Sequence, residues 1–353
     1  MKHNLFLGVQ PAPYRVDLCN WLYEQLDCDI YHLTPTGEDL AFDQAALKSS
    51  FRFDYKIYPK GSLPFLASLV KSHRPEVVFV SEFSMTALWM CLLKRMYRTS
   101  FRVVSICDDS MDMILGNDFS KRHTYARRYM PRLLDNLVLD NPETAAWYQN
   151  RFGKGVCFPI VSDERRLRAE LEDALPLSRE LVRQHGLAGF PVLLYVGRLM
   201  PLKQVDLLLR AFAPLKEKAR LVIVGDGESM ESLQALDDSL GTGALFTGRK
   251  SGQELMAWYN VGGIHLLPSR QEAFGAVTGE ALAAGLYSLV SERAGSSSLI
   301  RPGNGRVLPA DDPSAWTAAI RDFLPLVDTE IHLKDSKLPV CFESLAGQVF
   351  RSL

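Results

Sequence analysis

Two carboxylates, Glu272 and Glu280, stand with seven residues between them at an expected loop-to-helix junction. Glu272 falls on the loop after an apolar run, residues 264–267, and Glu280 falls within the first turns of the following helix. Carboxylates accept strongly from hydroxyl groups, so such a pair can hold two sugar rings of one ligand, and the helix N-terminus can offer amides to phosphate oxygens. Taken singly, Glu280 is equally explained as a surface-helix acid and Glu272 as an N-cap-like loop acid.

Two cations, Arg198 and Lys203, flank the turn after the apolar run at residues 192–196. Gly197 allows close backbone approach, and the two cations can neutralise the charges of a diphosphate. A basic pair at a turn is also common on solvated surfaces. It is the combination of both cations with both glutamates that favours a binding site.

Gly225 opens a second turn, Gly225-Asp226-Gly227, whose glycines can let the chain pass close to a bound group. An ordinary strand-to-helix turn explains it equally well. Neither this turn nor the one at Gly8 matches the G-x-G-x-x-G dinucleotide fingerprint, and Pro11 and Pro13 stand where phosphate-facing amides are needed. A nicotinamide dehydrogenase is therefore disfavoured.

These motifs together resemble the retaining glycosyltransferases of the GT-B fold, often called family 4. The resemblance is dense over residues 190–310 and thin in the first half of the chain. It is carried by Gly197-Arg198, Lys203, Gly225-Asp226-Gly227, Phe246-Thr247-Gly248, Pro268-Ser269, Glu272, Glu280-Ala281 and Ala284-Gly285. One departure is Lys203-Gln204, where the family commonly has Lys-Gly.

The resemblance implies a role for each matched residue. Arg198 and Lys203 would bind the donor diphosphate, Glu272 the hydroxyls of the transferred sugar and Glu280 the ribose, while residues 247–250 would lie beside the base. The implied donor-binding set is Gly197, Arg198, Lys203, Gly225, Gly248, Arg249, Glu272, Phe274, Gly275, Ala276, Val277 and Glu280.

On the acceptor side the resemblance implies Arg15 and Asp108. Arg15 belongs to a Pro-Tyr-Arg segment that replaces the family's glycine-rich loop and would contribute charge, and Asp108 follows Cys107 where many members have His-Asp. Asp108 would hold an acceptor hydroxyl at the reaction centre, or else cap the next segment together with Asp109. Glu82, directly after residues 77–81, is a further candidate. The catalytic set is then Asp108, Arg198, Lys203 and Glu272.

Composition sets limits on the function. The net charge of -1 supplies no field for nucleic acid, and the 353 residues, 47% of them hydrophobic, are typical of a soluble protein of two domains. The six cysteines lack metal-ligand spacing and indicate reduced thiols in the cytoplasm. The apolar run at residues 5–9 is too short for a signal peptide. We expect no metal or other cofactor, so protein cations would stabilise the leaving diphosphate.

Short apolar runs alternate with helical periodicity along the whole chain, which predicts α/β architecture with parallel sheets. The fold class is therefore two doubly wound Rossmann-like domains of the GT-B type, facing across a cleft. We expect an acceptor domain at residues 1–165 and a donor domain at residues 166–339, with the linker within residues 158–191. Residues 340–353 form an amphipathic helix predicted to cross back to the first domain. The predicted strands are residues 5–9, 29–32, 53–58, 77–81, 102–106, 136–139, 192–196, 221–224, 244–246, 264–267, 288–291 and 306–308.

Residues 94–132 are basic, with interleaved tyrosines Tyr97, Tyr125 and Tyr129. Each cation near an anionic leaflet contributes roughly 1 kcal/mol, so this segment can attract a membrane surface or a lipid diphosphate; solvated helix faces are the alternative. The expected activity is transfer of a sugar from a nucleotide sugar to a glycan or lipid-linked acceptor, in bacterial surface polysaccharide, lipopolysaccharide or glycolipid synthesis. A nucleotide-sugar epimerase and a non-catalytic nucleotide-sugar-binding module stay as alternatives.

Overall fold

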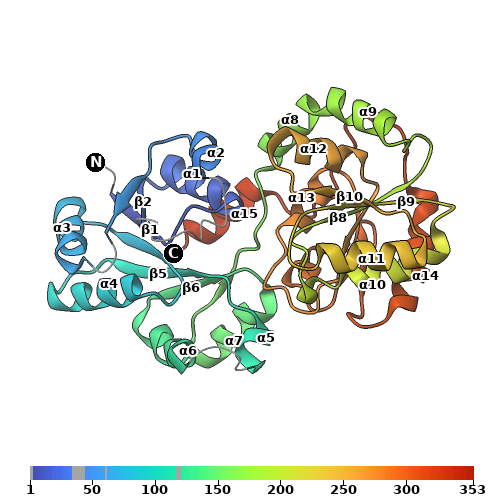
Figure 1. Ribbon diagram of the computed structural model, residues 1–353. Coiled ribbons are helices and arrows are strands. Elements are labelled where there is room, and N and C mark those ends of the chain that lie inside the picture. Colours follow the sequence, from blue (N-terminus) through green and yellow to red (C-terminus); the bar gives the residue numbers. More distant parts are fainter. Residues whose placement is uncertain (1–2, 34–43, 60–61, 117–120) are drawn as a thin grey trace. The chain divides into compact units, whose positions relative to one another are not determined.

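The chain divides into two compact units. The computed structural model describes residues 3–33, 44–59, 62–116 and 121–353. Unit 1 comprises Met1–Ile160 together with Phe342–Leu353, and unit 2 comprises Val161–Cys341. Each unit is a parallel sheet with its own helices and its own core (Figure 1).

Unit 1 is built on a seven-stranded parallel sheet of order β3-β2-β1-β4-β5-β6-β7. The strand order reverses between β1 and β4, and such a switch point is where open α/β sheets bind ligands, beyond the carboxyl ends of the strands. The strands are β1 (Asn4–Gly8), β2 (Cys28–Leu33), β3 (Lys56–Tyr58), β4 (Val77–Ser81), β5 (Arg102–Cys107), β6 (Asn136–Leu139) and β7 (Val156–Cys157).

Two helices of unit 1, α4 and α7, begin at polar caps. Ser84 accepts a hydrogen bond from the Ala87 amide at 3.3 Å, and Asn141 accepts one from the Thr144 amide at 2.8 Å, which satisfies donors that a helix start leaves free. The helices are α1 (Val16–Gln25), α2 (Gln44–Ser50), α3 (Leu63–His73), α4 (Met85–Met96), α5 (Met111–Gly116), α6 (Lys121–Leu133), α7 (Pro142–Phe152) and α15 (Phe342–Phe350).

Unit 2 is built on a six-stranded parallel sheet of order β10-β9-β8-β11-β12-β13, with its switch point between β8 and β11. Its central strand β8 (Val192–Val196) is buried throughout, as expected for a strand covered by helices on both faces. The other elements are α8 (Glu164–Asp173), α9 (Leu175–Gln184), α10 (Val205–Phe212), β9 (Arg220–Val224), α11 (Met230–Leu240), β10 (Leu245–Gly248), α12 (Gly252–Val261), β11 (Ile264–Leu267), α13 (Val277–Ala283), β12 (Tyr287–Ser291), β13 (Gly305–Leu308) and α14 (Pro313–Phe323).

The structure corrects the predicted division of the chain in two respects. The units part between residues 160 and 161 rather than 165 and 166, because α8 belongs to unit 2, where Leu167 and Leu171 are buried in the core. The expected linker region at 158–191 therefore consists largely of α8 and α9. The short strand β7 was not predicted, since two residues leave no apolar run to recognise.

The C-terminal helix α15 packs on unit 1, as predicted. The ring of Phe350 lies 4.9 Å from that of Phe158 and 5.7 Å from that of Phe79. The Trp21 indole N–H also donates to Glu343 at 3.0 Å. These contacts join the last helix to the first sheet (Figure 1).

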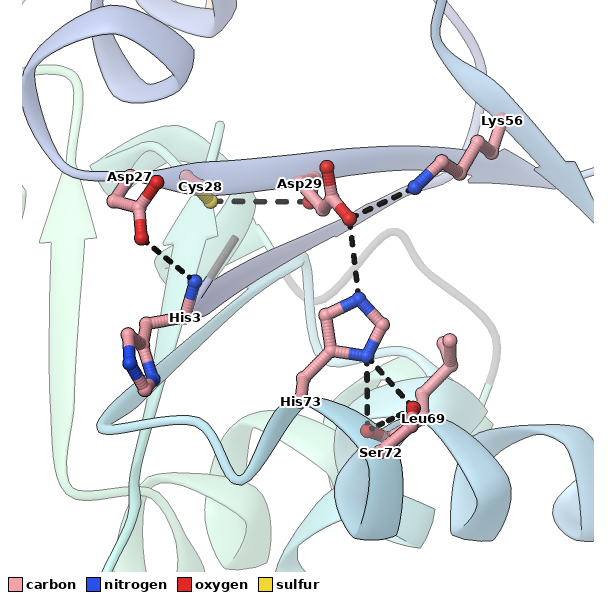
Figure 2. A network of polar contacts seen from close by, with 8 residues as sticks. All are labelled: His3, Asp27, Cys28, Asp29, Lys56, Leu69, Ser72 and His73. Atoms are coloured by element: carbon pink, nitrogen blue, oxygen red, sulfur yellow. Dashed lines mark hydrogen bonds and ion pairs between the residues drawn. The ribbon is translucent and has the colours of Figure 1, made fainter. Parts of the chain in front are cut away.

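A polar network joins β2, β3 and α3 in unit 1 (Figure 2). Asp29 accepts from the Lys56 ammonium at 2.8 Å and lies 3.1 Å from His73 Nε2. His73 is the last residue of α3, and its Nδ1 lies 2.9 Å from the Ser72 hydroxyl.

Within the described ranges, the structure has no helix long and apolar enough to cross a membrane.

Candidate functional site

The predicted residues Lys203 and Glu272 meet at the switch point of unit 2. Lys203 ends the turn after β8, Glu272 lies on the loop after β11, and their side chains form an ion pair. Both are mostly buried, with 16% and 17% of their side chains exposed. In a partly buried ion pair of this kind each charge compensates the other, which offsets the cost of taking both out of water.

Arg198 lies in the same turn after β8 as Lys203 and is exposed. Its backbone carbonyl accepts from the Tyr195 hydroxyl at 2.9 Å, which fixes the turn after β8. Among the residues that the structure describes, no carboxylate forms an ion pair with Arg198. This cation is therefore available to an anionic ligand.

The glycines after β9 let two loops of the protein approach each other closely. A Cβ atom at Gly225 would lie 1.8 Å from the Gly197 carbonyl oxygen, and one at Gly227 would lie 2.3 Å from the Leu199 carbonyl oxygen. The two turns are also joined by a hydrogen bond from the Leu199 amide to the Asp226 carbonyl at 2.9 Å. The absence of side chains at these glycines thus leaves room for the two loops to pack together, and a role of Gly225 in donor binding stays a prediction.

Glu280 lies in the first turn of α13 and accepts from the Tyr259 hydroxyl of α12 at 2.7 Å. The loop that leads to it bends at Gly275, which has a φ of +91° that favours glycine. The residues after β12 support this loop, since the Gly295 amide donates to the Glu272 carbonyl at 3.2 Å. A Cβ at Gly295 would lie 2.3 Å from the Ala273 carbonyl oxygen.

The remaining predicted donor residues surround the same edge of the sheet. Gly248 ends β10 and its carbonyl accepts from the Gly225 amide at 2.9 Å, and Arg249 next to it is exposed. Phe274 is buried, and its backbone carbonyl accepts from the Ser296 amide at 2.7 Å. Ala276 and Val277 lie where the loop enters α13.

In unit 1 the predicted residue Arg15 is bound by carboxylates. Its guanidinium forms an ion pair with Asp108 and a second, at 3.2 Å, with Asp140. The Tyr14 hydroxyl donates to Asp108 at 3.3 Å. The charge of Arg15 is therefore compensated within the protein, contrary to the expectation that it adds positive charge to the site.

Glu82 joins this cluster at the carboxyl end of β4. Its carboxylate accepts from the Asp108 amide at 3.1 Å and from the Cys107 thiol at 3.1 Å. Burial, reinforced by repulsion from Asp108, raises the pKa of Glu82 to about 7. Its φ of +56° is uncommon for a residue with a side chain, and such strain persists where the surroundings fix the conformation.

The capping alternative for Asp108 and Asp109 is wrong. The carboxylate of Asp109 is buried and binds the Arg127 guanidinium at 2.6 Å and the Tyr148 hydroxyl at 2.7 Å. The Ser110 hydroxyl instead accepts from the Met113 amide at 3.3 Å near the start of α5. Asp109 is thus a structural residue, and Asp108 belongs to the Arg15 cluster.

The sequence analysis missed three residues of these clusters: Asp140, Tyr14 and Tyr259. Asp140 directly follows β6, so the rule that selected Glu82 could have found it. Tyr259 lies on a different helix from its partner Glu280, and no spacing indicates that contact. In the described portion of the chain, no group of three or more His, Cys, Asp or Glu is arranged to hold a metal ion.

Comparison with known proteins finds a family match within unit 2. Residues 190–325 match the family model described as Glycosyl transferases group 1. The matched residues include the stretch, residues 190–310, that carries the resemblance to glycosyltransferases seen in the sequence.

Curated relatives match the same region. A D-inositol 3-phosphate glycosyltransferase of Streptomyces coelicolor is 34% identical over 158 residues, which is 40% of this chain and 35% of the relative. A lipopolysaccharide 1,2-N-acetylglucosaminetransferase of Salmonella typhimurium is 35% identical over 125 residues, 32% of this chain and 33% of the relative. The matches thus span only about a third of the length of these relatives.

Solved structures match both units. Anabaena HepE in complex with UDP has a TM-score of 0.72 at 17% identity, with 99% of this chain and 96% of HepE covered. The lipopolysaccharide outer core galactosyltransferase WaaB has a TM-score of 0.68 at 16% identity, with 99% of both chains covered. These likenesses confirm the predicted fold class, two Rossmann-like domains of the GT-B type.

Proposed function

We propose that this protein is a retaining glycosyltransferase that moves a sugar from a nucleotide diphosphate donor to a glycan or lipid-linked acceptor. The observation that carries the proposal is the Lys203–Glu272 ion pair together with the exposed Arg198 of the same turn, at the switch point of the unit that matches the group 1 family model. The similarity to transferases acting on inositol phosphate and lipopolysaccharide favours an acceptor of bacterial surface polysaccharide, lipopolysaccharide or glycolipid synthesis.

The donor side of the mechanism follows from the charges of unit 2. Arg198 and Lys203 bind the diphosphate and stabilise the negative charge that develops as it leaves. Glu272 turns from Lys203 to the sugar hydroxyls, so that the lysine stands between phosphate and sugar. Glu280, held by Tyr259, accepts from the ribose hydroxyls. Departure and attack on the same face of the sugar preserve its configuration, without the paired carboxylates of a retaining glycosidase.

The acceptor side is assigned to the Arg15 cluster of unit 1. Arg15 forms an ion pair with the Asp108 carboxylate, and Glu82 accepts from the Asp108 backbone amide. The Asp108 carboxylate therefore has a defined position. Of the two acids that pair with Arg15, Asp108 is the more exposed, with 31% of its side chain exposed against 1% for Asp140. It is therefore the carboxylate available to an acceptor hydroxyl.

The donor assignment is tested by thermal shift and by donor hydrolysis with a panel of nucleotide sugars. We expect one donor to raise the melting temperature and release its nucleoside diphosphate. Glu272→Gln and Lys203→Met should lower turnover at least about 100-fold, as loss of groups that stabilise a transition state does. Asp322→Asn, in the exposed pair with Arg306, is the matched control and should leave turnover unchanged.

Three results would contradict the proposal or part of it. Absence of both binding and hydrolysis across the panel would remove the donor site. A rearranged sugar formed without any acceptor would instead indicate an epimerase, and full activity of Glu272→Gln would favour a different catalytic residue.

We further propose that α6 places the protein at the inner face of the plasma membrane. Tyr125, Tyr129 and Leu133 recur every four residues on this helix and are 60%, 51% and 52% exposed. Exposed cations accompany them, Arg128 and Arg132 among them, whereas Arg127 is bound to Asp109. A basic helix with exposed aromatic residues suits an anionic lipid interface. We expect the protein to sediment with anionic but not with neutral vesicles, and the double variant Tyr125→Ser/Tyr129→Ser to lose this binding. Equal binding to the two kinds of vesicle would refute the membrane proposal.

A further inference from the structure

Asp311 connects the loops that carry the Lys203–Glu272 pair. It lies shortly after β13, and a single oxygen, Oδ1, accepts from Gln204 Nε2 at 3.2 Å and from Arg270 Nη2 at 3.0 Å and Nε at 3.3 Å. Gln204 comes directly after Lys203, and Arg270 comes two residues before Glu272. Hydrogen bonds from Arg270 and Gln204 hold the pKa of Asp311 below its usual value, so Asp311 is an anion at neutral pH.

Gln204 is the residue that most needs such an anchor. Its backbone is left-handed, with φ +49° and ψ +41°, at the residue that precedes α10. This conformation favours glycine, and a longer residue holds it only where its surroundings fix it. The Gln204 side chain is buried, and in the described structure its Oε1 has no hydrogen-bond partner, so the contact with Asp311 anchors it.

The two loops are also joined through their backbones. The Arg270 amide donates to the Leu202 carbonyl at 2.8 Å. Two connections therefore link the loop after β8 to the loop after β11: this backbone hydrogen bond and the bridge that Asp311 forms between Gln204 and Arg270. Because Lys203 and Glu272 lie within two residues of the bridge, its loss would let the turn after β8 relax.

We propose that Asp311 is a positioning residue, which sets the left-handed turn at Gln204 and thereby the placement of Lys203 against Glu272. This inference rests on the proposed function, since it specifies how the donor site is held ready. A glycine at position 204 would adopt the left-handed turn through its backbone freedom alone. In this protein the contact between the Gln204 side chain and the Asp311 carboxylate holds the turn instead.

The exposure of the bridge makes the inference testable apart from folding. The side chains of Arg270 and Asp311 are 59% and 58% exposed, and exposed pairs contribute little to overall stability. We therefore expect Asp311→Ala to keep the melting temperature within about 2 °C of the wild type. We expect kcat for donor hydrolysis to fall about fivefold to tenfold, because a small misplacement of a binding group costs rate.

A double variant separates positioning from other effects. In Gln204→Gly the left-handed turn no longer needs an anchor, so Gln204→Gly/Asp311→Ala should recover most of the kcat lost in Asp311→Ala. Asp322→Ala, which breaks the exposed pair with Arg306, is the control for loss of a surface carboxylate. Unchanged kcat in Asp311→Ala, or a double variant as slow as Asp311→Ala, would overturn the inference.

A readout independent of activity distinguishes this inference from the proposed function. The rate at which acetic anhydride modifies Lys203, followed by mass spectrometry, reports how firmly its ammonium is held by Glu272. We expect that rate to rise in Asp311→Ala and to return to the wild-type rate in the double variant. If no nucleotide sugar binds but the labelling follows this pattern, the proposed function fails and the positioning role stands; unchanged labelling in Asp311→Ala refutes the positioning role.

Discussion

At the scale of single residues, close approach between backbones governs the loops after β8 and β9. Gly225 is the clearest case, because its missing side chain leaves room for the Gly197 carbonyl. The turn that presents Arg198 thus depends on a residue that carries no chemistry of its own.

Gly225→Ala should therefore destabilise unit 2. The new Cβ would lie 1.8 Å from a carbonyl oxygen, so one of the two loops must move, and we expect a loss of about 2–4 kcal/mol in the free energy of unfolding. Urea denaturation measures it. Gly303→Ala is the matched control, since a Cβ there meets nothing within 4 Å, and equal stability of the two variants would contradict the explanation.

At the scale of elements, the Asp29 network fastens α3 to the strands β2 and β3 (Figure 2). Burial opposes the ionisation of Asp29, but hydrogen bonds from Lys56 and His73 hold its pKa below the usual value. Since the unfolded pKa is about 3.9, the stabilisation is fully present above about pH 5 and is lost as the pH falls through 4 and below.

Asp29→Asn should then cost stability at neutral pH and little in acid. We expect a loss of about 1–2 kcal/mol in the free energy of unfolding at pH 7. This is the range for hydrogen bonds to a charged group when one partner, here Lys56, is half exposed. At pH 3 the variant and the wild type should approach each other in urea denaturation. Asp54→Asn, at an exposed aspartate, should change neither value; a difference that persists at pH 3 would show that charge is not the cause.

The elements were largely predictable and their cross-contacts were not. Strand β8 could be predicted because five consecutive apolar residues are required of a strand buried on both faces. The placement of Arg198, Lys203 and Glu272 could be predicted because they follow apolar runs that form the strands β8 and β11, while their role in donor binding stays a prediction. The bonds from Tyr259 to Glu280 and from Gln204 to Asp311 join distant segments, and such pairing depends on packing that no local spacing records.

At the scale of the whole molecule, α15 makes unit 1 depend on the last residues of the chain. Phe350 is buried against Phe158 and Phe79. Phe350→Ala should destabilise unit 1 by about 3–5 kcal/mol, as cavities of this size do, and leave the unfolding of unit 2 unchanged. Gln348→Ala, on the exposed side of α15, is the control. Urea unfolding that shifts for both units together would contradict this assignment.

The return of the chain to unit 1 also sets an order of maturation on the ribosome. Because residues 161–341 are inserted between two parts of unit 1, all of unit 2 is synthesised before α15 exists. Unit 2 can close around β8 while the first sheet still exposes Phe79 and Phe158. The first sheet is thus completed only after all of unit 2 has been made, and until then Phe79 and Phe158 lack their partner Phe350, which leaves an apolar surface exposed to aggregation.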